Sequence, residues 1–189
     1  HQLDNAAAAI ACIDQLPQFA ISDAQIARAL TQTKWPARLQ PLTGGRLASL
    51  LPNGFELWLD GCHNEQGAKA LAAWLRGKAG KPVYAICGIT KSKDPAAFLQ
   101  PLARYFAALY AIPISSEPYL GEPPGAPPQA VCEAAGMLGL QAQACDSLEK
   151  ALQTIASHAK TPGLVIICGS LYLARSVLLA EAAKETSCS

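Results

Sequence analysis

Three apolar runs of the chain end in the same way, and this repetition constrains the fold more than any other feature. The runs read LWLDG, YAICG and VIICG, and their final residues are Gly61, Gly88 and Gly169. Polar residues and then a helical pattern follow each glycine, which is typical of strand-to-helix turns in parallel sheets. A single glycine of this kind does not indicate a ligand site, because a short strand-to-helix turn needs a small residue whether or not a ligand binds. Three such turns together favour a ligand site, because parallel strands end at one shared edge, where open α/β sheets bind ligands.

The rest of the chain continues this alternation of strand and helix patterns. It predicts an α/β fold with a mostly parallel, Rossmann-like sheet covered by helices on both faces. The expected strands are 55–61, 81–88, 108–114, 141–146 and 163–169, and the expected helices are 64–78, 94–107, 130–140, 147–159 and 170–184.

A short helical segment precedes this α/β region. Helical spacing predicts one helix over 4–16, ended by Pro17, and a second over 21–30 with Ser22 or Asp23 as its cap. The pair Trp35-Pro36 then favours extended chain. We therefore expect two domains, residues 1–34 and 35–189.

Composition excludes several classes of partner. The net charge is +1, which gives no electrostatic reason for binding nucleic acid or a membrane surface. No apolar run reaches the roughly 18–20 residues that a membrane span needs. Seven cysteines without a C-x-x-C pair indicate reduced thiols in a cytoplasmic protein. The opening residues HQLDNAAAAIA resemble the interior of a domain, so we expect a fragment of a longer protein.

The turn after the first apolar run carries the most informative polar residues. Asp60 stands at the strand end, where a carboxylate suits the hydroxyls of a ribose, although a helix-cap role is an alternative. His63 can pack on a base or sugar or donate to a phosphate, or it can be merely structural. Asn64 is the natural cap of the next helix. Zinc binding by Cys62 and His63 lacks further ligands at useful spacing.

Other candidate residues lie on the extended segment and on the later turns. Arg38 can reach a phosphate with two parallel hydrogen bonds, or can be a surface arginine. Lys93 and Asp94 follow the Gly88 turn, where a solvated turn and a helix cap are the alternative. Ser170 follows Gly169, but the G-x-S-x-G pattern of serine hydrolases is absent. G-x-G-x-x-G after a strand and G-x-x-x-x-G-K-[ST] are also absent, so the phosphates of any ATP need groups outside this chain.

Taken in order, four motifs resemble a known family. They are WPARLQ, LDGCHNEQGAKALAAWL, GITKSKD and CGSLYLA. Together they resemble the C-terminal part of folylpolyglutamate synthase/dihydrofolate synthase, in the Mur-ligase superfamily. The resemblance implies the Rossmann-like C-terminal domain over 35–189, and the helical end of the central ATP-binding domain over 1–34. Two departures are Cys62 in place of alanine and Glu65 in place of proline.

The resemblance also implies a reaction. ATP and Mg²⁺ activate a folate or dihydropteroate carboxylate as an acyl phosphate. The amino group of L-glutamate attacks it, releasing phosphate beside ADP. The P-loop, most metal ligands and most of the folate pocket belong to the missing N-terminal and central domains, so this chain alone is expected to be inactive.

By the same resemblance, four residues match ATP-binding positions of the family. Asn5 matches a contact to adenine, Arg38 a contact to the phosphates, Asp60 the ribose-side carboxylate, and His63 a histidine against the nucleotide. Ser170 matches a residue near the incoming glutamate. The resemblance fixes no role for Lys93, Asp94 or Arg175. Another Mur-family amide ligase and a stand-alone ligand-binding module are the alternative functions.

Overall fold

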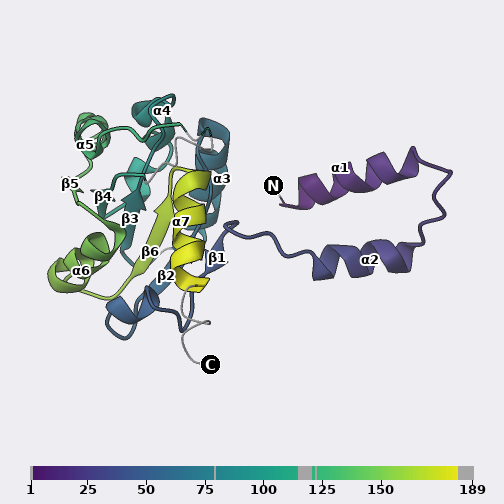
Figure 1. The fold of residues 1–189 in the computed structure, drawn as a ribbon, viewed down its shortest axis with the longest axis horizontal. Coiled ribbons are helices and arrows are strands. Elements are labelled where there is room, and N and C mark those ends of the chain that lie inside the picture. The colour runs from purple at the N-terminus through teal and green to yellow at the C-terminus, as the bar shows by residue number, and fades with distance from the viewer. Residues whose placement is uncertain (1, 79, 115–120, 122, 183–189) are drawn as a thin grey trace. The chain divides into compact units, whose positions relative to one another are not determined.

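A computed structural model describes residues 2–78, 80–114, 121 and 123–182 of the chain (Figure 1). The chain divides into two compact units, residues 1–36 and 37–189. The assignment of residues 1–34 to a separate central domain stays a prediction. Cys188 and most of the Pro-rich segment that begins at 115 lie outside the described residues.

The first unit consists of the helices α1 (Gln2–Asp14) and α2 (Asp23–Gln32). Ser22 caps α2 and forms a capping box with Gln25, so the predicted start of this helix is confirmed. No residue of α2 is buried in the described unit, and Leu30 is 46% exposed.

The second unit is built on one six-stranded sheet with the order β1-β2-β6-β3-β4-β5 (Figure 1). The edge strand β1 pairs antiparallel with β2, and every other pairing is parallel. The predicted mostly parallel sheet is therefore confirmed. The strands are β1 (Gln40–Pro41), β2 (Glu56–Leu59), β3 (Val83–Cys87), β4 (Ala108–Ala111), β5 (Ala142–Ala144) and β6 (Leu164–Cys168).

Helices cover both faces of this sheet, as the sequence predicts. One apolar cluster joins the sheet to α3 (Glu65–Arg76), α4 (Pro95–Leu99) and α5 (Pro128–Met137). A second cluster joins the opposite face to α6 (Leu148–His158) and α7 (Leu171–Ala182). The central strands β3 and β6 are buried at every position, as expected for strands covered on both faces.

Local sequence explains how the helix after β2 begins. The Asn64 side chain accepts a hydrogen bond from the backbone N–H of Gly67 at 2.8 Å and caps α3. The cap role predicted for Asn64 is confirmed. Four apolar residues on one face of α3 are buried in the core, namely Ala68, Leu71, Ala72 and Leu75.

The single helix predicted over 94–107 is wrong. Asp94 does cap a helix with Pro95 in its first turn, but α4 ends at Leu99. Pro101 follows two residues later and cannot continue the hydrogen bonds of an α-helix, because it lacks a backbone N–H. A short 3₁₀ helix, Ala103–Tyr105, then leads to β4.

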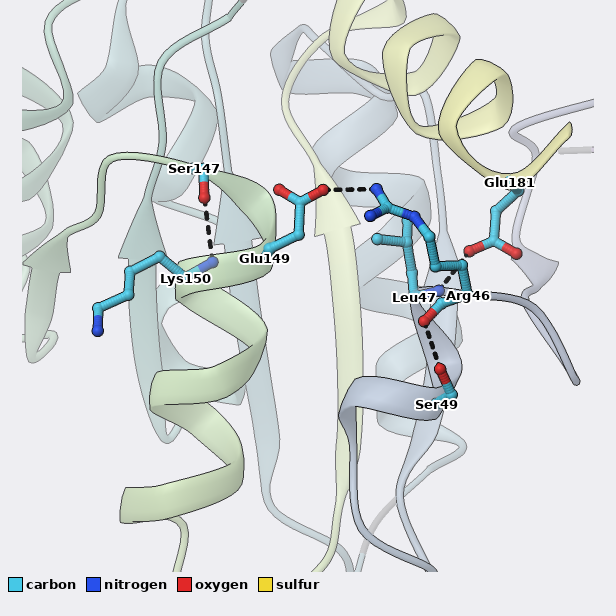
Figure 2. Close-up of polar contacts among 7 residues, drawn as sticks. All are labelled: Arg46, Leu47, Ser49, Ser147, Glu149, Lys150 and Glu181. Carbon is cyan, nitrogen blue, oxygen red and sulfur yellow. Dashed lines mark hydrogen bonds and ion pairs between the residues drawn. The ribbon is translucent and has the colours of Figure 1, made fainter. Parts of the chain in front are cut away.

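A polar brace ties the segment between β1 and β2 to the second helical layer (Figure 2). Arg46 forms an ion pair with Glu149 of α6 at 2.6 Å. The backbone N–H of Leu47 donates to Glu181 of α7 at 2.7 Å, and the Leu47 side chain is fully buried. These contacts fix the ends of α6 and α7 relative to the β1–β2 connection.

No helix in the described residues is long and apolar enough to cross a membrane. Six cysteines lie in that part of the chain, and all six are free thiols. Three of them are core residues at the carboxyl ends of the central strands, namely Cys62, Cys87 and Cys168.

Candidate functional site

The three glycine turns meet at one edge of the sheet, as the sequence predicts. Strand β6 lies between β2 and β3, and all three are parallel. Gly169 donates its N–H to the Cys62 carbonyl at 2.9 Å, and Gly88 donates to the Cys168 carbonyl at 3.3 Å. Hydrogen bonding therefore continues from the strands into the turns and holds the turns in one row.

A pocket of about 490 Å³ opens beside this row of turns. The turn after β2 contributes His63, the turn after β3 contributes Lys93, the turn after β6 contributes Ser170, and α7 contributes Arg175. The remaining lining residues are Thr90, Ser92, Pro123, Leu171 and Tyr172. Two residues with predicted roles, His63 and Ser170, thus share one pocket with Lys93 and Arg175, to which the resemblance fixes no role.

The pocket is suited to an anion. Its described lining contains the cationic side chains Lys93 and Arg175 and no Asp or Glu. The N-terminus of the twelve-residue helix α7 adds the positive end of a helix dipole. A carboxylate or phosphate group fits this environment.

His63 enters the pocket with a defined hydrogen bond. Its Nδ1 lies 3.0 Å from the carbonyl oxygen of Gly61. Because a carbonyl can only accept, Nδ1 must carry the proton. In the neutral ring, Nε2 is then the nitrogen that is left as an acceptor, and it donates only when the ring is the imidazolium.

Asp60 is buried rather than open to the pocket. It is 5% exposed, and one carboxylate oxygen accepts from the Cys62 N–H at 2.8 Å. The other oxygen accepts from the Leu39 N–H, also at 2.8 Å. It does not line the pocket and does not cap α3, so its geometry is that of an anchor for backbone.

Arg38 is exposed on the turn that Asp60 holds, and it is not among the described residues lining the pocket. Its neighbours Ala37 and Leu39 have φ values of +55° and +45°. In the described residues these are the only non-glycine residues with positive φ. The Gly61 N–H donates to the Ala37 carbonyl at 2.7 Å, so Gly61 contacts both this turn and the His63 ring.

The buried thiols beneath these turns have low reactivity. A hydrogen bond with the Cys168 side chain, followed by burial, raises the pKa of the Cys62 thiol well above its ordinary value. A neutral, buried thiol is a poor nucleophile and a poor metal ligand. Among the described residues, no group of three or more His, Cys, Asp or Glu side chains can hold a metal ion.

The other predicted residues take different positions. Ser170 is 1% exposed, and its hydroxyl oxygen accepts from the Tyr172 N–H at 3.1 Å at the start of α7. Asn5 is exposed on α1 in the first unit. Asp94 caps α4 by accepting from the Ala96 N–H at 2.9 Å and does not line the pocket, whereas its neighbour Lys93 does.

Sequence reasoning missed Thr90, Ser92 and Tyr172 as pocket residues. The first two lie in the turn after Gly88, and their position after a strand-end glycine was the available signal. Tyr172 lies in the first turn of α7, within an apolar stretch that reads as a core helix face.

The fold and the site define a Rossmann-like α/β domain with a pocket suited to an anion at the carboxyl edge of its sheet. The chain belongs to the family described as dihydrofolate synthetase, C-terminal domain, whose sequence model matches residues 46–180. The family resemblance stated from the motifs is therefore confirmed. A comparison with curated protein sequences finds no match.

Solved structures extend the match to nearly the whole chain. Ligand-free bifunctional folylpolyglutamate synthase/dihydrofolate synthase from Yersinia pestis is 28% identical with a TM-score of 0.75, covering 94% of this chain and 39% of that one. A bifunctional synthase with Mn, AMPPNP and L-glutamate bound is 26% identical, with a TM-score of 0.76 and the same coverage.

E. coli FolC in complex with DHPP and ADP is 22% identical with a TM-score of 0.76, covering 96% of this chain and 39% of that one, and it supports the fold alone. The chain spans about two fifths of the length of these three solved chains.

Proposed function

We propose that this chain is the C-terminal part of an ATP-dependent ligase that joins L-glutamate to the carboxylate of a folate or dihydropteroate. The reaction passes through an acyl phosphate and gives ADP and phosphate. The observation that carries the proposal is the pocket with Lys93 and Arg175, and with no Asp or Glu among its described lining residues, at the carboxyl edge of a domain of this family. A related synthase at 26% identity was solved with L-glutamate bound, which supports the substrate class.

The pocket has the chemistry to receive the amino-acid substrate. Glutamate carries two carboxylates, and the cations Lys93 and Arg175 together with the α7 N-terminus attract such groups. Ser170 retains its hydroxyl proton for donation to a carboxylate, because its oxygen is the acceptor in the bond from Tyr172. In this proposal Lys93 and Arg175 hold glutamate while Ser170 orients it.

The nucleotide is assigned to the remaining predicted residues. Asn5 contacts adenine, Arg38 contacts the phosphates, Asp60 is the ribose-side carboxylate and His63 lies against the nucleotide, as the family resemblance implies. The acceptor nitrogen Nε2 of neutral His63 suits a hydroxyl or amino group better than a phosphate. In this proposal His63, which lines the glutamate pocket, lies between that pocket and the nucleotide.

Other domains supply what this chain lacks. The described residues contain no cluster that fits Mg²⁺, so we derive no step through a metal here and assign its ligands to the missing domains. The sequence has no P-loop pattern, and the N-terminal and central domains of a longer cytoplasmic protein provide it. Residues 1–34 form the end of that central domain in this proposal, and the chain alone is inactive.

Glutamate incorporation by the full-length protein tests the proposal. With ATP, Mg²⁺ and dihydropteroate or a folate, radiolabelled L-glutamate should enter the pterin product. Lys93→Ala should raise the KM for glutamate by about tenfold or more, as expected for loss of a charged contact. Lys91→Ala is the matched control, because Lys91 is on the same turn but does not line the pocket. Equal effects of the two variants would refute the glutamate assignment.

A further inference from the structure

The turn that carries Arg38 has a backbone conformation that residues other than glycine rarely adopt. Ala37 and Leu39 both have left-handed φ values, of +55° and +45°. Such a conformation is unfavourable for residues with a Cβ and persists only where surrounding contacts hold it. Something in the fold must therefore offset the strain on each side of Arg38.

Three hydrogen bonds surround this turn. The Leu39 N–H donates to Oδ2 of Asp60, and the Gly61 N–H donates to the Ala37 carbonyl. The Ala37 N–H donates to the side chain of Gln40 at 2.8 Å. The bond to Asp60 is the one that involves a charged acceptor, which makes it the strongest kind of the three.

Asp60 is itself held rigidly. Its own N–H donates to the Ile167 carbonyl of β6 at 2.9 Å, and its second carboxylate oxygen accepts from Cys62. Its side chain is buried, as is Ala37 at 4% exposure, whereas Arg38 between the clamped residues is exposed. The contacts connect the central sheet to the turn and leave the arginine free to meet a ligand.

We infer that Asp60 is a positioning residue for Arg38: its carboxylate clamps the left-handed turn Ala37–Leu39 and thereby fixes the backbone from which the Arg38 side chain projects. This inference rests on the proposed function for the role of Arg38 toward phosphates. It differs from the ribose contact implied by the family resemblance, because Asp60 acts here through the turn and needs no contact with the nucleotide.

The clamp is tested first in the chain of residues 1–189, without any ligand. Asp60→Asn keeps the shape of the side chain, but an amide cannot accept from both Leu39 and Cys62. Amide hydrogen exchange at Leu39 or Cys62 should accelerate by about tenfold or more, the value of a hydrogen bond to a charged group. Asp94→Asn is the matched control, with the same charge change at an exposed helix cap.

A rescue variant separates the clamp from general destabilisation. Glycine accepts positive φ without penalty, so Ala37→Gly should restore part of the lost protection in the Asp60→Asn background. The same substitution should not rescue a protein that is merely less stable. Unchanged exchange in Asp60→Asn, or no rescue by Ala37→Gly, would overturn the clamp.

The functional arm uses a double-mutant cycle in the full-length protein. Arg38→Ala and Asp60→Asn should each raise the KM for ATP, and the double variant should be no worse than Arg38→Ala alone. Additive losses would show that Asp60 contacts the nucleotide directly and would overturn the inference. An unchanged KM in Arg38→Ala would refute the role of Arg38 while the exchange result on the clamp still stood.

Discussion

The Nδ1 atom of His63 lies 3.0 Å from the carbonyl oxygen of Gly61, and this contact fixes the tautomer of the ring. A carbonyl oxygen cannot donate, so the neutral ring must carry its proton on Nδ1 and leave Nε2 bare. Two-dimensional ¹H–¹⁵N NMR of the ring nitrogens should therefore show a protonated Nδ1 and an unprotonated Nε2 at alkaline pH. The opposite tautomer would contradict the contact.

Substitution of His63 tests the same contact through its effect on the stability of the protein. An asparagine amide nitrogen occupies the position of Nδ1, so His63→Asn should keep the bond to Gly61, while His63→Ala should lose about 0.5–1.5 kcal/mol of stability. Denaturant unfolding measures the difference. His158→Ala, at the exposed end of α6, is the control and should change stability much less.

Gly169 is required by geometry at the end of β6. Its φ is +108°, and an added Cβ would lie 2.6 Å from the Gly88 carbonyl oxygen. Gly169→Ala should therefore reduce the free energy of unfolding by about 2–3 kcal/mol or more, since it combines backbone strain with a contact to backbone. Chemical denaturation of the chain measures this loss.

Gly136→Ala is the matched control for that substitution. Gly136 lies in α5, and an added Cβ there would meet nothing within 4 Å. The alanine should stabilise the protein by up to about 1 kcal/mol through helix propensity. If both glycine variants changed stability equally, the close approach of the Gly169 and Gly88 turns would be wrong.

The brace in Figure 2 predicts a pH dependence of stability. A hydrogen bond from its own backbone N–H, and then the Arg46 guanidinium, hold the pKa of Glu149 below its ordinary value. The folded state thus binds this proton less readily than the unfolded state, whose pKa is about 4.3. The stabilisation is complete above that value and is lost as the pH falls through the lower, folded-state pKa.

Glu149→Gln isolates that effect. It should lower the free energy of unfolding by about 0.2–1 kcal/mol at pH 7, the range for exposed ion pairs, and the difference from wild type should vanish in acid. Thermal or urea unfolding from pH 7 to pH 3 measures it. Glu65→Gln is the control. Glu65 also forms an ion pair, with Lys69, but its side chain is more exposed than that of Glu149, at 58% against 38%. Parallel pH curves for wild type and Glu149→Gln would contradict the prediction.

Local patterns in the sequence were enough to predict the elements that position the site. The Asn64 cap, the helix predicted over 64–78 and the shared edge of Gly61, Gly88 and Gly169 all follow from short-range spacing and turn chemistry. The hydrophobic pattern of a helix or a strand repeats every two to four residues, so it can be recognised in the sequence without knowledge of the fold.

Long-range pairing explains what the sequence could not reveal. The bond between Leu39 and Asp60 spans 21 positions, and it changes Asp60 from an open carboxylate to a buried anchor. Lys93 and Arg175 share a pocket only because β3 and β6 are neighbours in the sheet. The strand β1 is two residues long and carries no period that could have been recognised.

The most direct test compares two proteins in one assay: residues 1–189 alone, and the full-length protein that contains them. With ATP, Mg²⁺, L-glutamate and dihydropteroate or a folate, glutamate-dependent ADP release is measured for each. We predict release by the full-length protein and none by residues 1–189, because the proposed ligase has its P-loop in other domains. Glutamate-dependent ADP release by residues 1–189 alone, or its absence from the full-length protein, would contradict the proposed split ligase site.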